Sequence, residues 1–245
     1  LDGRKYARAS NGLGEPSNEM TLRFAMMDQR GRLFDERALD ERVCDCCPTS
    51  AVRTPHGALV VYRDRTETEI RDTAIVRFRN GKWSEPQTLY ADNWEVKGCP
   101  VNGPAIAAQE EKVAVAWFTM ANETPRVQVA FSNNEGVDFG DPIQVDDGNP
   151  LGRVDAVLLP DGAALVSWLE TTDGGAEIRL RRIQPNGSSD VSMTLTQSST
   201  ERASGFPRMV RQGNEIYFAW TQPGNPAQVR TAVATLNSGT DANSD

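Results

Sequence analysis

The sequence is poor in several features, and each scarcity excludes a class of protein. No apolar stretch approaches the roughly 18 residues that a membrane-spanning helix needs. Positive charge is in deficit, because 26 Lys and Arg stand against 34 Asp and Glu, and a net charge of −8 would repel a phosphate backbone. The apolar runs also lack the 3.6-residue spacing of helical repeats. We therefore expect no membrane span, no nucleic-acid partner and no helical solenoid.

A pattern of apolar residues followed by an aromatic recurs four times, at 57–65, 111–119, 162–170 and 214–222. The aromatics are Tyr62, Trp117, Trp168 and Trp220, which follow one another at intervals of 55, 51 and 52 residues. A period near 50 with several short strands in each unit is typical of β-propeller blades. The 20 glycines and 14 prolines suit the many turns that such strands require.

Each repeat predicts four antiparallel strands. The innermost strand precedes the aromatic, as in GPAIAA and RVDAVLLP, and a third strand follows it, as in DTAIVRF. A fourth strand comes next, announced by NGKWSEPQTL at 80–89. The predicted fold is therefore an all-β propeller over residues 1–237. It comprises about four and a half blades, lacks an N-terminal part, and would have six blades when complete. Residues 238–245 are small and polar, and we expect a disordered tail there.

One turn links this pattern to a known family. The segment 132–139, SNNEGVDF, resembles the Asp-box turn Ser-x-Asp-x-Gly-x-x-Trp of bacterial neuraminidase (BNR) repeats, with Asn in place of Asp and Phe in place of Trp. The chain thus looks like the sialidase-like propeller superfamily. The run VCDCCPT, together with YRDR and GCPVNGP, is similar to a bacterial group with a CDCC motif that is usually labelled sialidase-like.

The resemblance implies a glycoside hydrolase chemistry that the sequence leaves unassigned. Sialidases resemble one another in an arginine triad, a tyrosine nucleophile paired with a glutamate, and an aspartate acid/base. Of the four tyrosines here, Tyr62 and Tyr217 lie in predicted second strands, Tyr90 ends a fourth strand and Tyr6 lies in a loop. None is an evident nucleophile, so the catalytic residues stay unknown and exo-sialidase activity stays an open expectation.

Propeller topology brings the loops at 43–48, 63–72, 98–103, 152–155, 170–175 and 202–208 to one mouth of the central channel. We expect ligand-binding residues there that are charged, amide-bearing or aromatic: Arg63, Asp64, Arg65, Asp72, Trp94, Asn102, Arg153, Asp155 and Arg208. The alternative for the charged residues is a solvated loop with surface ion pairs. For Asn102 the alternative is a turn cap. The lone His56 is expected in a turn on the opposite face.

All four cysteines are expected in one patch at the same mouth. Cys44 and Cys99 each lie 18 residues before the aromatic of their repeat, and Cys46 and Cys47 share the first loop. In an oxidising compartment the four sulfurs would form disulfides. In a metal-handling setting they would form a soft site for Cu(I) or Zn(II), although the spacing lacks two Cys-x-x-Cys knuckles.

Two hypotheses of function follow. The first is a secreted or periplasmic sialidase-like propeller that binds, or binds and hydrolyses, a glycan or another polar or anionic ligand at the channel mouth. The second is a non-enzymatic propeller that uses Cys44, Cys46, Cys47 and Cys99 for metal binding or redox chemistry. A protein-interaction scaffold is a third possibility, and the oligomeric state is left open.

Overall fold

The computed structural model describes residues 19–236. Residues 1–18 of the predicted propeller and the predicted tail at 238–245 lie outside these residues. The described part consists of short strands and two 3-10 turns, Ala121–Glu123 and Arg202–Ser204. No helix among these residues has the length and apolar character to cross a bilayer.

The strands form five antiparallel sheets, as the repeat predicted. A two-stranded sheet, β1 and β2, comes first, and the next sheet contains β3 to β7, with both β6 and β7 paired to β5. Then come β8 to β11, β12 to β15, and a final three-stranded sheet, β16 to β18. The bounds are β1 Met20–Met27, β2 Leu33–Val43, β3 Ser50–Thr54, β4 Gly57–Arg63, β5 Thr73–Arg79, β6 Lys82–Trp83, β7 Gln87–Tyr90, β8 Ala105–Gln109, β9 Lys112–Thr119, β10 Arg126–Ser132, β11 Ile143–Gln144, β12 Pro150–Leu158, β13 Ala164–Thr172, β14 Gly175–Ile183, β15 Met193–Ser198, β16 Arg208–Gln212, β17 Glu215–Gln222 and β18 Gln228–Thr235.

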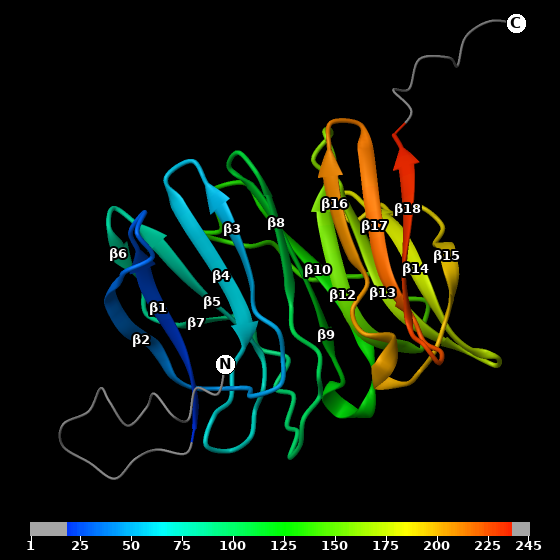
Figure 1. The fold of residues 1–245 in the computed structure, drawn as a ribbon, viewed down its shortest axis with the longest axis horizontal. Helices are drawn as coiled ribbons and strands as arrows, with labels where there is room; N and C mark the ends of the chain where they lie inside the picture. Colours follow the sequence, from blue (N-terminus) through cyan, green and yellow to red (C-terminus); the bar gives the residue numbers. More distant parts are fainter. Residues whose placement is uncertain (1–18, 237–245) are drawn as a thin grey trace, which may run out of the picture.

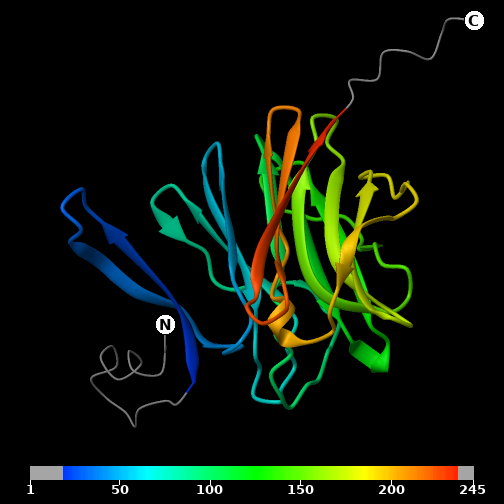
Figure 2. The same cartoon turned by 45° about the vertical axis from the view of Figure 1, so that its right-hand side comes forward.

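The sheets stand side by side as blades, with their innermost strands next to one another (Figures 1 and 2). Strand β3 lies beside β8, β8 beside β12, and β12 beside β16. Side chains join them: the Ile106 amide donates to Ser50 Oγ at 3.3 Å, and the Met209 amide donates to Asp155 Oδ2 at 2.6 Å. This arrangement confirms the predicted all-β propeller fold, in which each blade contributes one strand to the channel wall.

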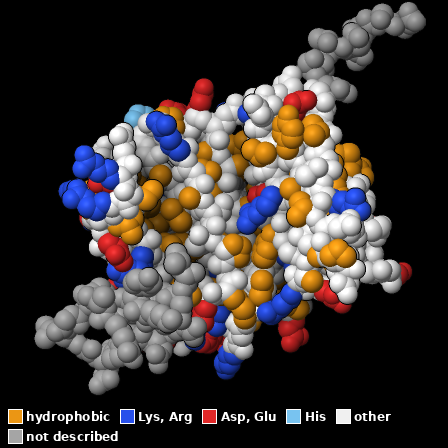
Figure 3. All heavy atoms as spheres, in the orientation of Figure 1, with side chains coloured by type: hydrophobic (Ala, Val, Ile, Leu, Met, Phe, Trp, Pro, Cys, Tyr) orange, Lys and Arg blue, Asp and Glu red, His pale blue; other side chains and the backbone are white. Residues whose placement is uncertain are grey.

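Apolar cores lie between neighbouring blades, because alternate residues of a strand face opposite sides of its sheet. In β9, Val113, Val115 and Trp117 pack against the preceding blade, whereas Ala114 and Ala116 pack against the following one. Both faces of the middle blades are therefore buried. At the two ends of the described chain, one face of β1–β2 and of β16–β18 leaves large apolar side chains exposed. Hydrophobic side chains accordingly reach the surface over both halves of the molecule (Figure 3).

The repeated aromatics each carry a polar group into the space between blades. The Tyr62 hydroxyl donates to Asp40 Oδ2 at 2.6 Å, Trp117 Nε1 donates to Asp92 Oδ2 at 2.8 Å, and Trp168 Nε1 donates to Glu170 Oε2 at 2.6 Å. Buried indole and phenol groups commonly have such partners, whereas Nε1 of Trp220, the fourth repeated aromatic, is buried without one among the described residues. Each of these three aromatics therefore has a carboxylate acceptor. Asp40 and Asp92 reach Tyr62 and Trp117 from the preceding blade.

The Asp-box-like segment forms the turn between β10 and β11. Asn134 Oδ1 accepts the amide of Asp138 at 3.0 Å, and Ser132 Oγ accepts the amide of Gly136 at 3.0 Å. Glu135 then reaches the neighbouring blade, where its carboxylate accepts the amide of His56 at 3.0 Å. His56 thus lies in a turn and pairs with a structural carboxylate, as a turn residue rather than a site residue would.

Gly136 supplies the first test of this turn. Its φ is +71°, and a Cβ there would lie 2.8 Å from Leu59 Cδ1. We expect Gly136→Ala to lower the free energy of unfolding by about 2 kcal/mol, from left-handed strain plus crowding. The control Gly187→Ala has a φ of +89° and open space around the added Cβ, so about 1 kcal/mol is expected there. Urea unfolding measures both, and equal losses would contradict the crowding.

Candidate functional site

A cleft of about 620 Å³ opens at the predicted mouth of the channel. Its walls come from the loops that enter β8, β12 and β16 and from the loop that leaves β9. Four of the predicted site residues line it, namely Trp94, Cys99, Asn102 and Arg153, and Thr171 and Arg202 join them. The propeller therefore brings together residues that lie more than a hundred positions apart in the chain.

The charge of this cleft is its most distinctive property. Its described lining contains two arginines and no Asp or Glu, although the whole chain has a net charge of −8. Arg153 donates from Nη1 to the carbonyls of Glu201 at 2.9 Å and Gly205 at 3.3 Å, and also to Ser204 Oγ. Burial and the nearby Arg202 lower the pKa of Arg153. Within residues 19–236, neither Arg153 nor Arg202 forms an ion pair with a carboxylate.

Trp94 and Asn102 form the inner part of the cleft. Trp94 is only 6% exposed, with its ring edge-to-face with Phe118 at 5.6 Å and the Arg63 guanidinium 4.9 Å from its centroid. Asn102 Oδ1 accepts the Arg153 amide at 2.7 Å, and its Nδ2 donates to the Leu151 carbonyl at 3.1 Å. Both residues thus shape the cleft through contacts with the protein, whatever they also offer to a ligand.

Arg63 lies behind the cleft and is 1% exposed. Its guanidinium donates to three backbone carbonyls, from Nε to Asn102 at 2.7 Å, from Nη1 to Arg71 at 2.5 Å and from Nη2 to Phe118 at 2.6 Å. Burial lowers its pKa. Since each nitrogen of the guanidinium donates to a backbone oxygen, this predicted ligand-binding residue is a structural tie between two loops and strand β9.

A conservative change at Arg63 tests that tie. Lysine keeps the charge but cannot reach three carbonyls in different directions. We expect Arg63→Lys to lower the free energy of unfolding by about 2–3 kcal/mol, because at least two charged hydrogen bonds are lost in a buried site. Arg53→Lys, at an exposed position of β3, is the matched control, for which we expect a change within about 0.5 kcal/mol. Equal effects in urea unfolding would refute the assignment.

Other predicted residues at the mouth are engaged in contacts outside the cleft. Asp72 accepts the amides of Asn93 at 2.9 Å and Trp94 at 3.0 Å, and Arg65 pairs with Glu69 at 2.8 Å. Asp155 accepts the amides of Ala156 and Met209 in the channel wall, with Arg208 Nη1 at 3.8 Å. Asp72 thereby positions the Trp94 loop, while Asp155 and Arg208 belong to the contact between β12 and β16.

Asp64 is half-buried beside two other carboxylates. It accepts the Arg65 amide at 2.7 Å. Burial, reinforced by the charges of Asp40 and Asp72, nevertheless raises the pKa of Asp64 from its ordinary value of 3.8 to about 6. The folded protein therefore holds this proton at a pH where the unfolded chain has released it.

This difference predicts a pH-dependent stability. Because the folded state binds the extra proton between pH 3.8 and about 6, the contribution of Asp64 to the free energy of unfolding falls as pH rises through that window. Asp64→Asn removes the titration, so we expect its stability relative to wild type to increase from pH 4 to pH 7. A flat difference for Asp64→Asn in urea unfolding would refute the shift.

The four cysteines gather beside the cleft. Cys46 and Cys99 form a disulfide that joins the loop before β3 to the loop before β8, and Cys44 and Cys47 are free thiols. The Sγ atoms of Cys44 and Cys47 lie 3.1 Å apart, and Arg71 Nη1 donates to Cys44 Sγ at 3.3 Å. The hydrogen bond between the thiols, supported by Arg71, lowers the pKa of Cys44 to about 5, despite the opposing effect of burial. It raises the pKa of Cys47 above its ordinary range, together with burial.

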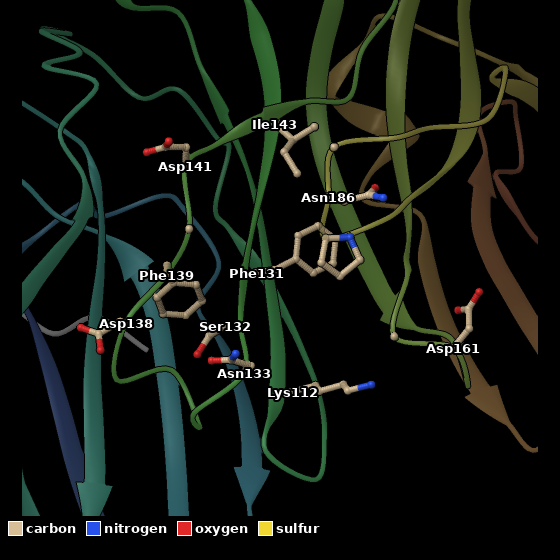
Figure 4. Close-up of a pocket in the computed structure, with 14 residues that line it drawn as sticks. Lys112, Phe131, Ser132, Asn133, Asp138, Phe139, Asp141, Ile143, Asp161 and Asn186 are labelled. Carbon is tan, nitrogen blue, oxygen red and sulfur yellow. The ribbon is translucent and has the colours of Figure 1, made fainter.

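A second cleft, of about 650 Å³, lies on the side of the Asp-box turn (Figure 4). Phe131, Phe139 and Ile143 supply its apolar part. The carboxylates of Asp138 and Asp161 lie at opposite ends of it (Figure 4), and Asp161 is paired with Arg182. Asp141 also lines it, and the predicted site residues lie outside its described lining. The mouth cleft is therefore the better candidate.

Two residues were missed by the sequence interpretation. Arg202 lies in the 202–208 loop that was assigned to the mouth, so its place was available from the repeat although it was not singled out. Arg71 was not among the predicted residues, yet its guanidinium contacts Cys44 and is held by Glu69 at 2.8 Å. No local sequence pattern predicts either role, because each arginine contacts a residue of another loop: Arg71 contacts Cys44, and Arg202 contacts Cys99.

Solved structures share the fold of this chain, whereas no family model and no curated protein matches its sequence. The GH43 protein BlXynB from Bacillus licheniformis is 13% identical over 78% of this chain and 40% of that one, with a TM-score of 0.51. The exo-beta-1,3-galactanase 1,3Gal43A from Clostridium thermocellum is 11% identical over 87% of this chain and 49% of its own, with a TM-score of 0.50. The shared feature is the propeller fold.

A sialidase is also among the similar structures. The Hadza microbial sialidase Hz136 is 16% identical over 73% of this chain and 43% of its own, with a TM-score of 0.45. This chain thus spans less than half the length of each of these three structures. Likeness at such identities concerns the fold alone, so the resemblance of the Asp-box and CDCC segments to sialidase-like proteins stays a prediction.

Proposed function

We propose that this propeller binds a carboxylate-bearing saccharide in the mouth cleft. The observation that carries the proposal is the charge of the lining: Arg153 and Arg202 line the cleft without a carboxylate partner among the described residues, and no acidic residue is found in the described wall. Arg153 is 8% exposed and its Nη atoms donate to oxygens of the 200–205 loop, so Arg202 is the more accessible of the two. Guanidinium groups bind carboxylates through paired, charge-assisted hydrogen bonds. The glycoside hydrolases named above support a glycan as the ligand class.

The remaining wall suits the uncharged part of a sugar. Thr171, Thr200 and Asn149 supply hydroxyl and amide groups, and Trp94 and Phe118 supply aromatic surface. Small-ligand sites commonly combine an apolar wall with a few polar groups that fix orientation. Arg153 is held by the 201–205 loop and is therefore preorganised, which lowers the entropic cost of binding.

The proposal is binding rather than hydrolysis by this cleft. Glycoside hydrolysis generally uses two carboxyl groups on either side of the scissile bond, and the described lining offers none. We further propose a secreted or periplasmic location, since the Cys46–Cys99 disulfide favours an oxidising compartment. The membrane and nucleic acid are not partners in this proposal.

Isothermal titration with glucuronic acid and with glucose tests the charge. We expect binding of the acid and at least about tenfold weaker binding of the neutral sugar, which corresponds to the loss of one charged hydrogen-bonded pair. Arg202→Gln should weaken binding of the acid by about the same factor and leave the glucose titration unchanged. Arg230→Gln, which makes the same change at an exposed position of β18, is the matched control.

A glycan array extends the test to larger ligands. Binding confined to glycans with uronic or sialic acid would support the proposal. No binding by any acidic glycan, or equal binding of acidic and neutral ones, would refute it. Equal weakening by Arg202→Gln and Arg230→Gln would show that net charge, not the cleft, is responsible.

A further inference from the structure

The four cysteine sulfur atoms lie in a row beside the mouth cleft, each in contact with the next. Cys47 Sγ lies 3.1 Å from Cys44 Sγ, Cys44 Sγ lies 3.9 Å from Cys46 Sγ, and Cys46 is bonded to Cys99. A dithiol with Cys-x-x-Cys spacing thus adjoins a disulfide. Backbone hydrogen bonds hold the two thiol residues. The Cys44 amide donates to the Arg63 carbonyl at 3.0 Å, and the Asn102 amide donates to Cys47 Sγ at 3.4 Å.

The surroundings favour a thiolate at Cys44. Arg71 Nη1 lies 3.3 Å from its sulfur, and Glu69 holds that guanidinium in place from Nη2 at 2.8 Å. A cation beside a thiol favours its ionised, nucleophilic form. Cys44 is 5% exposed, so the disulfide sulfur of Cys46 is a nearer target for it than any reagent in solution. Cys99, by contrast, is exposed and lines the cleft.

We propose that these cysteines form an intramolecular thiol–disulfide exchange site, in which the Cys44–Cys47 dithiol and the Cys46–Cys99 disulfide exchange partners. This activity is separate from the proposed saccharide binding and does not require it. The exchange opens the covalent tie between the loops before β3 and β8. It also places a free thiol, that of Cys99, on the wall of the cleft.

The reaction proceeds in two displacements. The Cys44 thiolate attacks Cys46 Sγ, a Cys44–Cys46 bond forms, and the Cys46–Cys99 bond breaks with its electron pair leaving on Cys99. Cys47, after losing its proton, then attacks Cys44 Sγ, and the electron pair of the Cys44–Cys46 bond leaves on Cys46. The two protons lost by Cys44 and Cys47 are regained by Cys46 and Cys99. One disulfide and two thiols exist before and after, so no external oxidant or reductant is consumed.

Alkylation of the native chain tests the exchange. Iodoacetamide is added to the folded protein without reductant, the reaction is stopped with acid, and the modified and disulfide-linked peptides are mapped by mass spectrometry. We expect labels on Cys99 and Cys46 in molecules that contain a Cys44–Cys47 disulfide. Cys44→Ser should slow labelling of Cys99 at least tenfold, because the attacking sulfur is absent.

Cys47→Ser is the paired variant, which removes a thiol but keeps the nucleophile. It should still label Cys99, and it should accumulate the Cys44–Cys46 disulfide, because the second displacement cannot occur. Thermal unfolding of both variants confirms that they fold. If one of them does not fold, the labels on the wild-type chain and on the other variant still decide the question.

Four results would overturn the proposal. In the first, Cys99 of the wild-type chain resists labelling until the protein unfolds. In the second, the isolated protein contains two disulfides and no thiol. In the third, Cys44→Ser labels Cys99 as fast as wild type does. In the fourth, a copper or zinc ion found by elemental analysis blocks labelling until a chelator removes it, which would make the sulfurs metal ligands instead.

Discussion

The buried guanidinium of Arg63 is the interaction on which the mouth of this propeller depends. It donates to carbonyls of Arg71, Asn102 and Phe118, which belong to three different segments of the chain. Those segments contain Arg71, which donates to Cys44 Sγ, and the cleft-lining residues Asn102 and Phe118. A buried charge without such partners would be costly. The loops are therefore held in one arrangement, because any other would leave a cation or several carbonyls unpaired.

The blades provide the rigid frame behind these loops. Strands β9 and β13 send alternate side chains into different cores, so each middle blade is packed on both faces. Loops between such strands can be irregular without loss of the fold, and binding sites commonly lie on loops of this kind. The left-handed backbone of Arg153, with a φ of 55°, is an irregularity inside β12 itself, where the pairing with β13 shifts register between Gly152 and Asp155. It occurs where the Arg153 amide reaches Asn102, at the inner end of the cleft.

Two chemistries meet at this mouth, one of charge and one of sulfur. The arginine-lined cleft and the cysteine chain share Cys99, and Arg202 donates to the Cys99 carbonyl at 3.3 Å. Asn102 also takes part in both, since its side chain holds the Arg153 loop and its amide contacts Cys47. The similar structures share the propeller fold alone. A change of disulfide pairing would therefore alter the cleft wall directly, because Cys99 lines the cleft.

The sequence by itself determined the blades, the strand order and the turn at 132–139, because these follow from local periodicity and from hydrogen bonds between near neighbours, such as Asn134 to Asp138. It also indicated that the cysteines and Arg153 meet at one mouth, since residues at equivalent positions of a repeat occupy equivalent places. Only the tertiary structure decided that Cys46 pairs with Cys99, that Arg63 is a buried tie and that Arg202 faces the cleft. Those outcomes depend on which atoms of distant loops come within about 3 Å, and a period near 50 residues leaves that distance undetermined.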